Sequence, residues 1–239
     1  MSSIIITGAG RRIGKGLALE FAKKGWDIIL HYNKSEESAL ALAGQIKLIG
    51  RHVFSLKADL RKKDEIKKMY EKIKSDFEIP VALINNAGIF PPPKPLNEID
   101  EDFVDNVLNI NLKAALWCSR EFSLISNHDS SIVNVSSLGG REVWKYRMTY
   151  NVSKAALIHL TKSLAVELAP KIKVNCVCPG SIEIPDDPAE HPLPDYSKIP
   201  AGRNGTVADV FAAVQFFVDC PNFISGQILT VDGAMHLKK

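Results

Sequence analysis

The sequence predicts an α/β fold, a doubly wound parallel sheet in a single domain. Short apolar runs rich in β-branched residues alternate with longer amphipathic stretches along the whole chain, which is the order expected of βαβ units. The apolar runs are continuous rather than alternating, as in sheets covered by helices on both faces. A length of 239 residues with 46% hydrophobic content suffices for one core and leaves little for a second. We therefore expect residues 1–239 to form one domain.

The first half of the chain alternates predicted strands with predicted helices. Residues 3–7 form a β-branched apolar run that ends in a glycine-rich turn, and the helical pattern follows directly. The stretch 35–49 is opened by Ser35 as an N-cap, with acidic residues in its first turn. The predicted strands are residues 3–7, 27–32, 52–56 and 81–84, and the predicted helices are residues 13–24, 35–49 and 64–77.

The second half repeats this alternation with one unusual connection. Residues 179–200 are rich in proline and too long for an ordinary link, and such excursions are either lids or disordered. We expect residues 179–205 to form a lid over the substrate. The remaining predicted strands are residues 131–135, 172–177 and 227–231, and the remaining predicted helices are residues 102–126, 150–168 and 207–218.

Composition excludes several classes of function. The net charge is +3 and the lysines are interspersed with acids, which indicates solvated helix faces rather than a nucleic-acid surface. No apolar run approaches the roughly 20 residues that cross a bilayer. Met1 leads directly into a predicted strand, so we expect no signal peptide and a cytoplasmic location.

The cysteines predict neither a metal site nor disulfides. No CxxC spacing and no clustered histidine accompany them. Two of them stand two positions apart in an apolar run, on one face of a predicted strand, and are interpreted as small buried hydrophobes in a reducing compartment. The four cysteines are Cys118, Cys176, Cys178 and Cys220.

A glycine-rich turn joins the first predicted strand to the first predicted helix. Glycines let the backbone approach a pyrophosphate, and the following helix N-terminus offers N–H groups to it. The alternative, a tight structural turn, is weaker because this turn lies between the first strand and first helix of an α/β chain. The predicted nucleotide contacts here are Gly8, Gly10, Arg11, Arg12, Ile13 and Gly14.

The end of the second predicted strand favours NADP(H) over NAD(H). An acid at this point binds a free ribose 2′-hydroxyl and repels a 2′-phosphate, but the sequence here is Tyr32-Asn33-Lys34-Ser35. The Lys34 ammonium and the Ser35 hydroxyl suit a 2′-phosphate, and an arginine of the glycine turn can join them. The alternative is that Lys34 is a solvated loop lysine and Ser35 only an N-cap.

Tyr150 and Lys154 are four residues apart in a predicted helix, so both side chains leave one face. An ammonium close to a phenol lowers the pKa of the phenol from about 10 toward working pH. Such a tyrosine can exchange a proton with an alcohol or carbonyl oxygen. The pair alone is weak evidence, because most such pairs are surface coincidences.

Other polar motifs follow the predicted strands in a characteristic order. Together they resemble the motifs of the short-chain dehydrogenase/reductase family over essentially the whole chain, and the resemblance implies a Rossmann-type fold. The motifs are Thr7-Gly8, Asp59-Leu60, Asn85-Asn86-Ala87-Gly88, Asn111, Ser136-Ser137, Tyr150 with Lys154, Pro179-Gly180 and Val231-Asp232-Gly233.

The resemblance implies roles for individual residues. Tyr150 is expected to be the general acid/base, and Lys154 to lower its pKa and bind the nicotinamide ribose. Ser137, at the family's usual spacing before Tyr150, is expected to hold the substrate oxygen, with Ser136 as the weaker candidate. Asn111 is expected to anchor a water relay behind Lys154, although helix packing is its alternative role. The further cofactor contacts implied are Asp59, Leu60, Asn86, Ala87, Gly88, Pro179, Gly180 and Ile182.

The sequence departs from the family pattern at several positions. Arg12 replaces the middle glycine of the nucleotide turn, and together with Phe90 and the end of the second strand it resembles pteridine reductases. Ser137 points back to ordinary carbonyl reduction, because pteridine reductases typically have aspartate there. Ile184 stands where many relatives have a threonine that holds the carboxamide, so backbone at Ile182 is expected to hold it instead.

These observations predict an NADP(H)-dependent carbonyl reductase that transfers hydride between nicotinamide and a carbonyl or alcohol. The best guess for the substrate is a 3-oxoacyl thioester on acyl carrier protein, with a pteridine or other small ketone as the alternative. The resemblance also implies a homotetramer or homodimer. A non-catalytic NADP-binding sensor is the alternative from another class, against which the full set Asn111, Ser137, Tyr150 and Lys154 argues.

Overall fold

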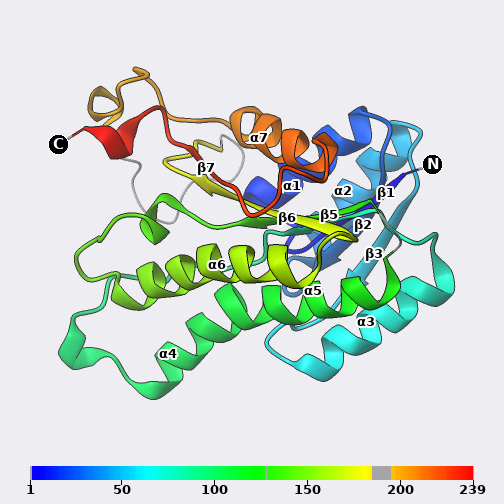
Figure 1. Ribbon diagram of the computed structural model, residues 1–239, viewed down its shortest axis with the longest axis horizontal. Coiled ribbons are helices and arrows are strands. Elements are labelled where there is room, and N and C mark those ends of the chain that lie inside the picture. Colours follow the sequence, from blue (N-terminus) through cyan, green and yellow to red (C-terminus); the bar gives the residue numbers. More distant parts are fainter. Residues whose placement is uncertain (1, 127–128, 185–194, 239) are drawn as a thin grey trace.

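The computed structural model is a parallel sheet between two layers of helices (Figure 1). It describes residues 2–126, 129–184 and 195–238. In this part of the chain the sheet has seven strands in the order β3-β2-β1-β4-β5-β6-β7, and each neighbouring pair is parallel. The strands are β1 (Ser3–Ile6), β2 (Asp27–Tyr32), β3 (Val53–Lys57), β4 (Ala82–Asn85), β5 (Ser130–Val135), β6 (Ile172–Pro179) and β7 (Ile228–Val231).

Helices connect successive strands, and short 3₁₀ turns lie in the loops. The α-helices are α1 (Arg12–Lys23), α2 (Glu36–Leu48), α3 (Lys63–Asp76), α4 (Glu101–Leu108), α5 (Ala114–Ile125), α6 (Met148–Glu167) and α7 (Val207–Asp219). The 3₁₀ turns are η1 (Leu96–Glu98), η3 (Leu138–Gly140), η4 (Tyr196–Lys198) and η5 (Met235–Leu237).

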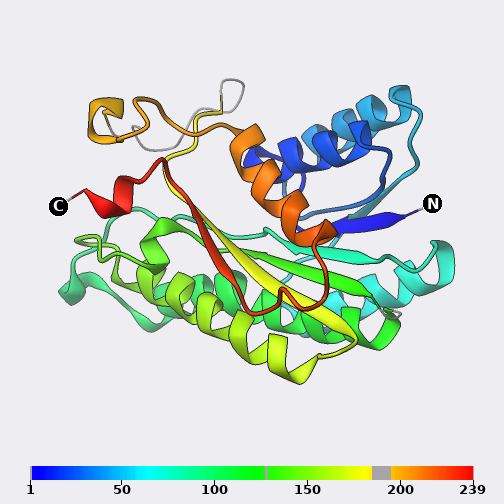
Figure 2. The same ribbon diagram turned by 45° about the horizontal axis from the view of Figure 1, so that its top comes forward.

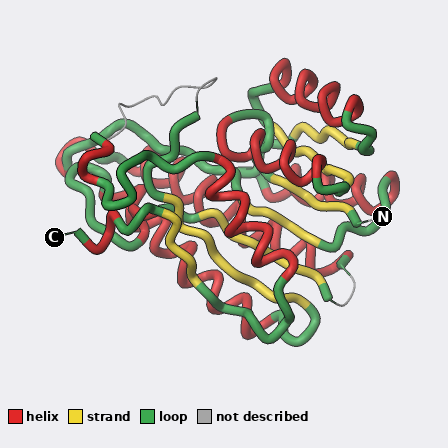
Figure 3. Tube along the Cα trace, turned by 90° about the horizontal axis from the view of Figure 1, so that it is seen from above, coloured by secondary structure: helices red, strands yellow, loops and turns green. Residues whose placement is uncertain are grey.

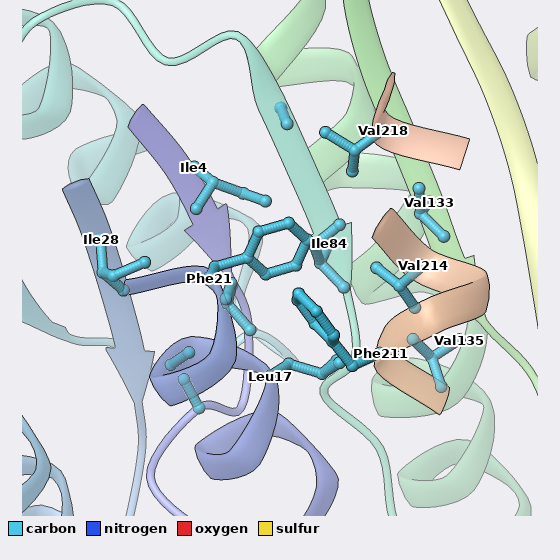
Figure 4. Packing of buried hydrophobic residues seen from close by; sticks show 14 of the residues in the cluster. Ile4, Leu17, Phe21, Ile28, Ile84, Val133, Val135, Phe211, Val214 and Val218 are labelled. Atoms are coloured by element: carbon cyan, nitrogen blue, oxygen red, sulfur yellow. The ribbon is translucent and has the colours of Figure 1, made fainter. Parts of the chain in front are cut away.

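The two faces of the sheet carry separate hydrophobic cores. Helices α1, α2 and α7 cover one face and α3, α5 and α6 the other, as Figure 2 shows. Because strand residues alternate between faces, Ile4 packs in the first core and Ile5 in the second. Phe21 of α1 and Phe211 of α7 meet edge to face, with ring centroids 5.0 Å apart, over the strands (Figure 4).

The chain direction across the sheet creates a crevice for a ligand. From β1 the sheet grows to β2 and β3 on one side and to β4 on the other, so the order reverses between β1 and β4. Ligands of open α/β sheets bind outside the carboxyl ends of the strands at such a reversal. Seen from above in Figure 3, helices of one layer lie across the strands of the sheet.

The predicted fold class is confirmed, and the observed elements depart from the predicted ones mainly in one helix. The pattern over residues 102–126 predicts one helix, but a π-helical turn, η2 (Asn109–Lys113), separates α4 from α5. The four cysteines are buried and unpaired. In the described part of the chain no helix combines the length and apolar character that a membrane span needs.

Candidate active site

The turn between β1 and α1 has no room for side chains at its glycines. Gly8 has a φ of +64°, and a Cβ there would lie 2.9 Å from the Cα of Ala87. A Cβ on Gly14 would lie 2.3 Å from the backbone oxygen of Gly8. No side-chain hydrogen bond caps the start of α1 at Arg11, so no side-chain cap takes up the N–H groups of the first turn. This uncapped turn fits the pyrophosphate of a dinucleotide.

The turn is held in place by β4 through Thr7 and Asn86. The Thr7 hydroxyl accepts hydrogen bonds from the backbone N–H groups of Asn86 and Ala87, both at 3.0 Å. The Asn86 amide donates to the backbone oxygens of Thr7 at 2.9 Å and Gly8 at 3.1 Å. Asn86 and Ala87 therefore lie beside the glycine turn, and the Asn86 side chain holds the turn. Their contact with the cofactor stays a prediction.

His31, at the end of β2, bonds to the same turn and was not among the predicted site residues. Its Nδ1 accepts from the Gly8 N–H at 3.0 Å, and its Nε2 lies 3.0 Å from the backbone oxygen of Ala58. These contacts assign the proton to Nε2. Burial lowers the pKa of His31 to about 4, so the imidazole is neutral. The available sequence signal was a histidine at a buried strand end next to the glycine turn.

The predicted 2′-phosphate residues gather at the end of β2. Tyr32 is buried and Lys34 is exposed. Gly10 packs against Ser35 so closely that a Cβ on Gly10 would lie 2.1 Å from the Ser35 Oγ. Asn33 is half-buried, and no acid follows until α2 begins at Glu36.

Two charged residues, Glu36 at the start of α2 and Arg12 in the glycine turn, affect whether a phosphate can bind at this end of the site. Glu36 pairs with Lys57 at 2.6 Å, so its charge is balanced within the protein. Arg12, which replaces the family glycine, has a φ of +51°, the left-handed region that favours glycine. A long cationic side chain is therefore kept at a position of backbone strain, which is typical of functional sites.

The turn after β3 carries the predicted adenine contacts. Both carboxylate oxygens of Asp59 accept from the Arg61 guanidinium, at 2.9 and 2.7 Å, and this bond lowers the pKa of Asp59. Leu60 is buried. The Asp59 carboxylate is thus engaged by Arg61, and its contact with adenine stays a prediction.

Tyr150 and Ser137 meet at the carboxyl end of β5. Tyr150 lies in the first turn of α6 and is 8% exposed, and the Ser137 side chain is close enough to its hydroxyl to lower the pKa of the phenol. Ser136 points elsewhere, because its hydroxyl donates to the backbone oxygen of Lys154 at 2.8 Å. The structure therefore places Ser137, and not Ser136, against the phenol.

The predicted lowering of the Tyr150 pKa by Lys154 is wrong in this structure. Burial dominates and raises the pKa of Tyr150 to about 12, while the nearby Ser137 side chain and the Arg147 charge act in the opposite direction. Lys154 donates instead to the backbone oxygen of Val135 at 3.0 Å. Burial lowers the pKa of Lys154 itself to about 8. The i, i+4 spacing brings both side chains to one face without aiming the ammonium at the phenol.

Asn111 braces the loop after β4. It lies in the π-helical turn and is buried. Its Oδ1 accepts from the Ile89 N–H at 2.8 Å, and its Nδ2 donates to the Ile89 oxygen at 3.0 Å and the Ser153 hydroxyl at 3.1 Å. A Cβ on Gly88 would lie 3.0 Å from the Asn111 Oδ1 and 3.5 Å from the Lys154 Nζ. Gly88 thus keeps open the space that faces both side chains.

Aromatic rings surround the Tyr150 phenol. The Phe90 ring meets it edge to face at 4.7 Å between centroids, and the Trp144 ring lies nearly parallel to it at 6.2 Å. The Arg147 guanidinium lies 4.1 Å from the Phe90 centroid and donates to the Pro91 oxygen. Arg147 is not among the predicted site residues, because no sequence motif marks it. The rings form an apolar wall around the Tyr150 phenol, with the Arg147 guanidinium beside it.

The segment after β6 begins with the last predicted cofactor contacts. A Cβ on Gly180, which follows Pro179, would lie 2.7 Å from the Asp232 Cβ. Ile182 pairs with Gly205 in an isolated β-bridge. The two hydrogen bonds of this bridge are donated by the N–H groups of Glu183 and Gly205, so the bridge does not use the Ile182 N–H. Of the predicted lid, 179–205, residues 185–194 lie outside the described residues.

Comparisons with known proteins agree with this geometry. The family model described as enoyl-(acyl carrier protein) reductase matches residues 8–236. The 3-oxoacyl-[acyl-carrier-protein] reductase FabG of Staphylococcus epidermidis is 33% identical over 98% of this chain and 99% of that protein. The hydroxynaphthalene reductase-like protein Arp2 of Metarhizium anisopliae is 28% identical over 96% of this chain and 92% of that protein.

Solved structures give the same result. A short-chain dehydrogenase from Burkholderia cenocepacia in complex with NADP superimposes with a TM-score of 0.91 at 32% identity, covering 98% of both chains. A blue fluorescent protein from a metagenomic library in complex with NADPH superimposes with a TM-score of 0.90 at 27% identity, covering 98% of this chain and 97% of that one. The uncapped turn, the lack of an acid at the end of β2 and the nearby cations fit NADP(H) as the cofactor. The chain belongs to the short-chain dehydrogenase/reductase family and is an NADP(H)-dependent oxidoreductase that acts on a CH–OH group or the corresponding carbonyl.

Proposed function

We propose that this enzyme reduces a carbonyl group, with Tyr150 as the general acid. The observation that carries the proposal is the closeness of the Ser137 side chain to the buried Tyr150 phenol, whose pKa it lowers. A carbonyl oxygen placed between the two hydroxyls would receive a hydrogen bond from each. Such preorganised donors stabilise the charge that develops on oxygen in the transition state.

The protonation states of the site suit reduction. Because burial raises the pKa of Tyr150 to about 12, the phenol carries its proton at neutral pH and can donate it. Lys154, with a pKa lowered to about 8, still carries charge at pH 7 and would bind the nicotinamide ribose. When bound, NADPH supplies the hydride. Asn111 would hold the loop after β4 in place through its bonds to Ile89. Its backbone or side chain would also anchor the predicted water relay.

The residues proposed to hold the cofactor lie along the crevice from β2 to β6. The glycine turn and the start of α1 would bind the pyrophosphate, and the end of β2 with Arg12 would bind the 2′-phosphate. The turn after β3 would bind adenine, and the residues after β4 and β6 would line the nicotinamide end. Residues 179–205 are proposed to close over the substrate.

For the substrate we favour a 3-oxoacyl thioester carried on acyl carrier protein. The support is the similarity over nearly full length to proteins named 3-oxoacyl-[acyl-carrier-protein] reductase, at 33–34% identity. The second candidate is a pteridine or other flat ketone. The walls that Phe90 and Trp144 form beside Tyr150 favour it, since a planar ring can stack on them.

A comparison of substrates decides between these candidates. Purified enzyme with NADPH would be given acetoacetyl-acyl carrier protein, acetoacetyl coenzyme A, a dihydropteridine and a flat aromatic ketone, and absorbance at 340 nm would be followed. The proposal expects the highest kcat/KM with the acetoacetyl thioesters. A higher kcat/KM with the flat ring compounds would favour the second candidate, and turnover of no carbonyl would contradict carbonyl reduction itself.

We also propose that the enzyme forms a homo-oligomer in the cytoplasm. β7 is an edge strand, and on it and the neighbouring α7 and loop the side chains of Phe216, Phe223 and Leu229 are exposed. An exposed edge with large apolar side chains is typical of a surface that another copy covers. Light scattering after gel filtration tests this, and a monomer at micromolar concentration would contradict it.

A further inference from the structure

We propose that His31 is a positioning residue that sets the glycine turn for NADP(H) through its neutral imidazole. His31 lies at the end of β2, between β1 and β3, and is 2% exposed. Its ring is therefore enclosed by the two neighbouring strand ends whose loops form the adenosine half of the proposed site. The inference rests on NADP(H) as the cofactor and not on the identity of the substrate.

On one side His31 accepts hydrogen bonds from two consecutive backbone N–H groups of the glycine turn. The Gly8 N–H donates to the His31 Nδ1 at 3.0 Å, and the Ala9 N–H donates to the His31 backbone oxygen at 2.9 Å. Since Gly8 has a positive φ, the direction of its N–H depends on a backbone conformation that most other residues avoid. The Nδ1 contact fixes that direction, and the phosphate is left to N–H groups nearer the start of α1.

On the other side the same ring holds the turn after β3. The Nε2–H donates to the backbone oxygen of Ala58 at 3.0 Å, while the Ala58 N–H donates to the Tyr32 oxygen at 3.1 Å. Both backbone groups of Ala58 are thus bonded to β2, directly before the Asp59-Leu60 turn. One side chain therefore joins the pyrophosphate loop to the adenine loop.

A neutral imidazole suits this place because it carries an acceptor and a donor on opposite edges of a rigid ring. Protonation would put a second N–H against the Gly8 N–H, and burial disfavours it. An asparagine at this position has an oxygen close to the Nδ1 position, and a glutamine amide reaches the Nε2 position. The asparagine variant is therefore expected to keep the contact with Gly8, and the glutamine variant the contact with Ala58.

The test is direct binding of NADPH by titration calorimetry, which needs no substrate. The variants are His31→Leu, His31→Asn and His31→Gln, with His52→Leu as the control, because His52 is exposed at the opposite end of β3. Each is measured well below its own unfolding midpoint, so that loss of fold does not mimic loss of affinity. We expect His31→Leu to weaken binding about tenfold or more, the effect of one lost orienting interaction of about 1.4 kcal/mol.

The pattern among the variants separates positioning from general stability. His31→Asn is expected to bind NADPH within about threefold of the unaltered protein, and His52→Leu to be unchanged. In turnover, KM for NADPH should rise while kcat at saturation stays constant. A folded His31→Leu with unaltered affinity would overturn the proposal.

Should His31→Leu fail to fold, the two amide variants decide. The proposal expects His31→Gln, which lacks the acceptor for Gly8, to bind NADPH about fivefold more weakly than His31→Asn. Equal affinities of the two would overturn it. Absence of NADPH binding by the unaltered protein would overturn the cofactor assignment and this proposal with it, whereas binding without turnover would count against the proposed reaction alone.

Discussion

The Lys154 Nζ donates a hydrogen bond to the Val135 backbone oxygen, 3.0 Å away, at the carboxyl end of β5. The Lys154 ammonium that makes this bond is almost completely buried. Burial lowers the pKa of Lys154 from its ordinary 10.5 to about 8, so holding the charge there costs folding free energy. Sites that keep such a group usually need it for function.

Lys154→Met is therefore expected to stabilise the cofactor-free protein while it removes activity. A pKa lower in the folded than in the unfolded state means that the unfolded state binds more protons between about pH 8 and pH 10.5. The destabilisation is fully present below pH 8 and fades as the pH rises to 10.5. At pH 7 we expect a gain of about 1–3 kcal/mol in the free energy of unfolding, after loss of the Val135 bond.

Urea denaturation at pH 7 and at pH 10 measures this effect. The gain should be larger at pH 7 than at pH 10, and the matched variant Lys162→Met, on the exposed side of α6, should show neither change. A Lys154→Met protein that is less stable than the unaltered protein at pH 7 would show that burial of the charge is not the dominant effect.

Arg12→Gly is expected to increase stability and to weaken NADPH binding. Glycine adopts the φ of +51° found at Arg12 without strain, which we expect to add about 0.5–1 kcal/mol after the entropy of glycine in the unfolded state is subtracted. Loss of the cation should weaken NADPH binding about tenfold. Thermal denaturation and calorimetry measure the two effects.

Arg11→Gly is the matched control for Arg12. Arg11 has a φ of −153°, which any residue adopts, so glycine there relieves no strain and should not stabilise the protein. Equal changes in stability for the two variants would contradict the role given to the backbone at Arg12.

Lys34→Asp is expected to shift the cofactor preference from NADPH toward NADH. A carboxylate at the end of β2 repels a 2′-phosphate and can bind a free 2′-hydroxyl. We expect the ratio of kcat/KM for NADPH to that for NADH to fall about tenfold or more. Lys47→Asp, on the exposed side of α2, should leave the ratio unchanged, and an unchanged ratio in Lys34→Asp would remove Lys34 from the 2′-phosphate site.

The positions of the strands along the chain and the polar residues at their ends could be predicted from sequence, because continuous apolar runs and polar strand ends are local features. The π-helical turn at Asn109–Lys113 could not, since it is one extra residue in a helix whose apolar pattern continues on both sides. Sequence spacing also could not show that Lys154 bonds to Val135, because that contact joins α6 to β5.

Two further residues show why the site was only partly predictable. His31 acts through bonds to Gly8 and Ala58, which are brought together only by the sheet order. Burial, which depends on the whole fold, reverses the predicted direction of the Tyr150 pKa. The motif predicts which groups take part in the reaction, and this stays a prediction, whereas the electrostatics of those groups required the packed structure.

The central claim is that the Tyr150 hydroxyl gives the proton, and Tyr150→Phe tests it most directly. Phenylalanine keeps the ring contacts with Phe90 and Trp144 and removes only the hydroxyl. The control is Tyr146→Phe, because Tyr146 is half exposed near the same site. With the best carbonyl substrate and NADPH, we expect kcat of Tyr150→Phe to fall about a hundredfold or more with NADPH affinity unchanged, and Tyr146→Phe to keep full activity. Equal activity of Tyr150→Phe and the unaltered enzyme would contradict the account.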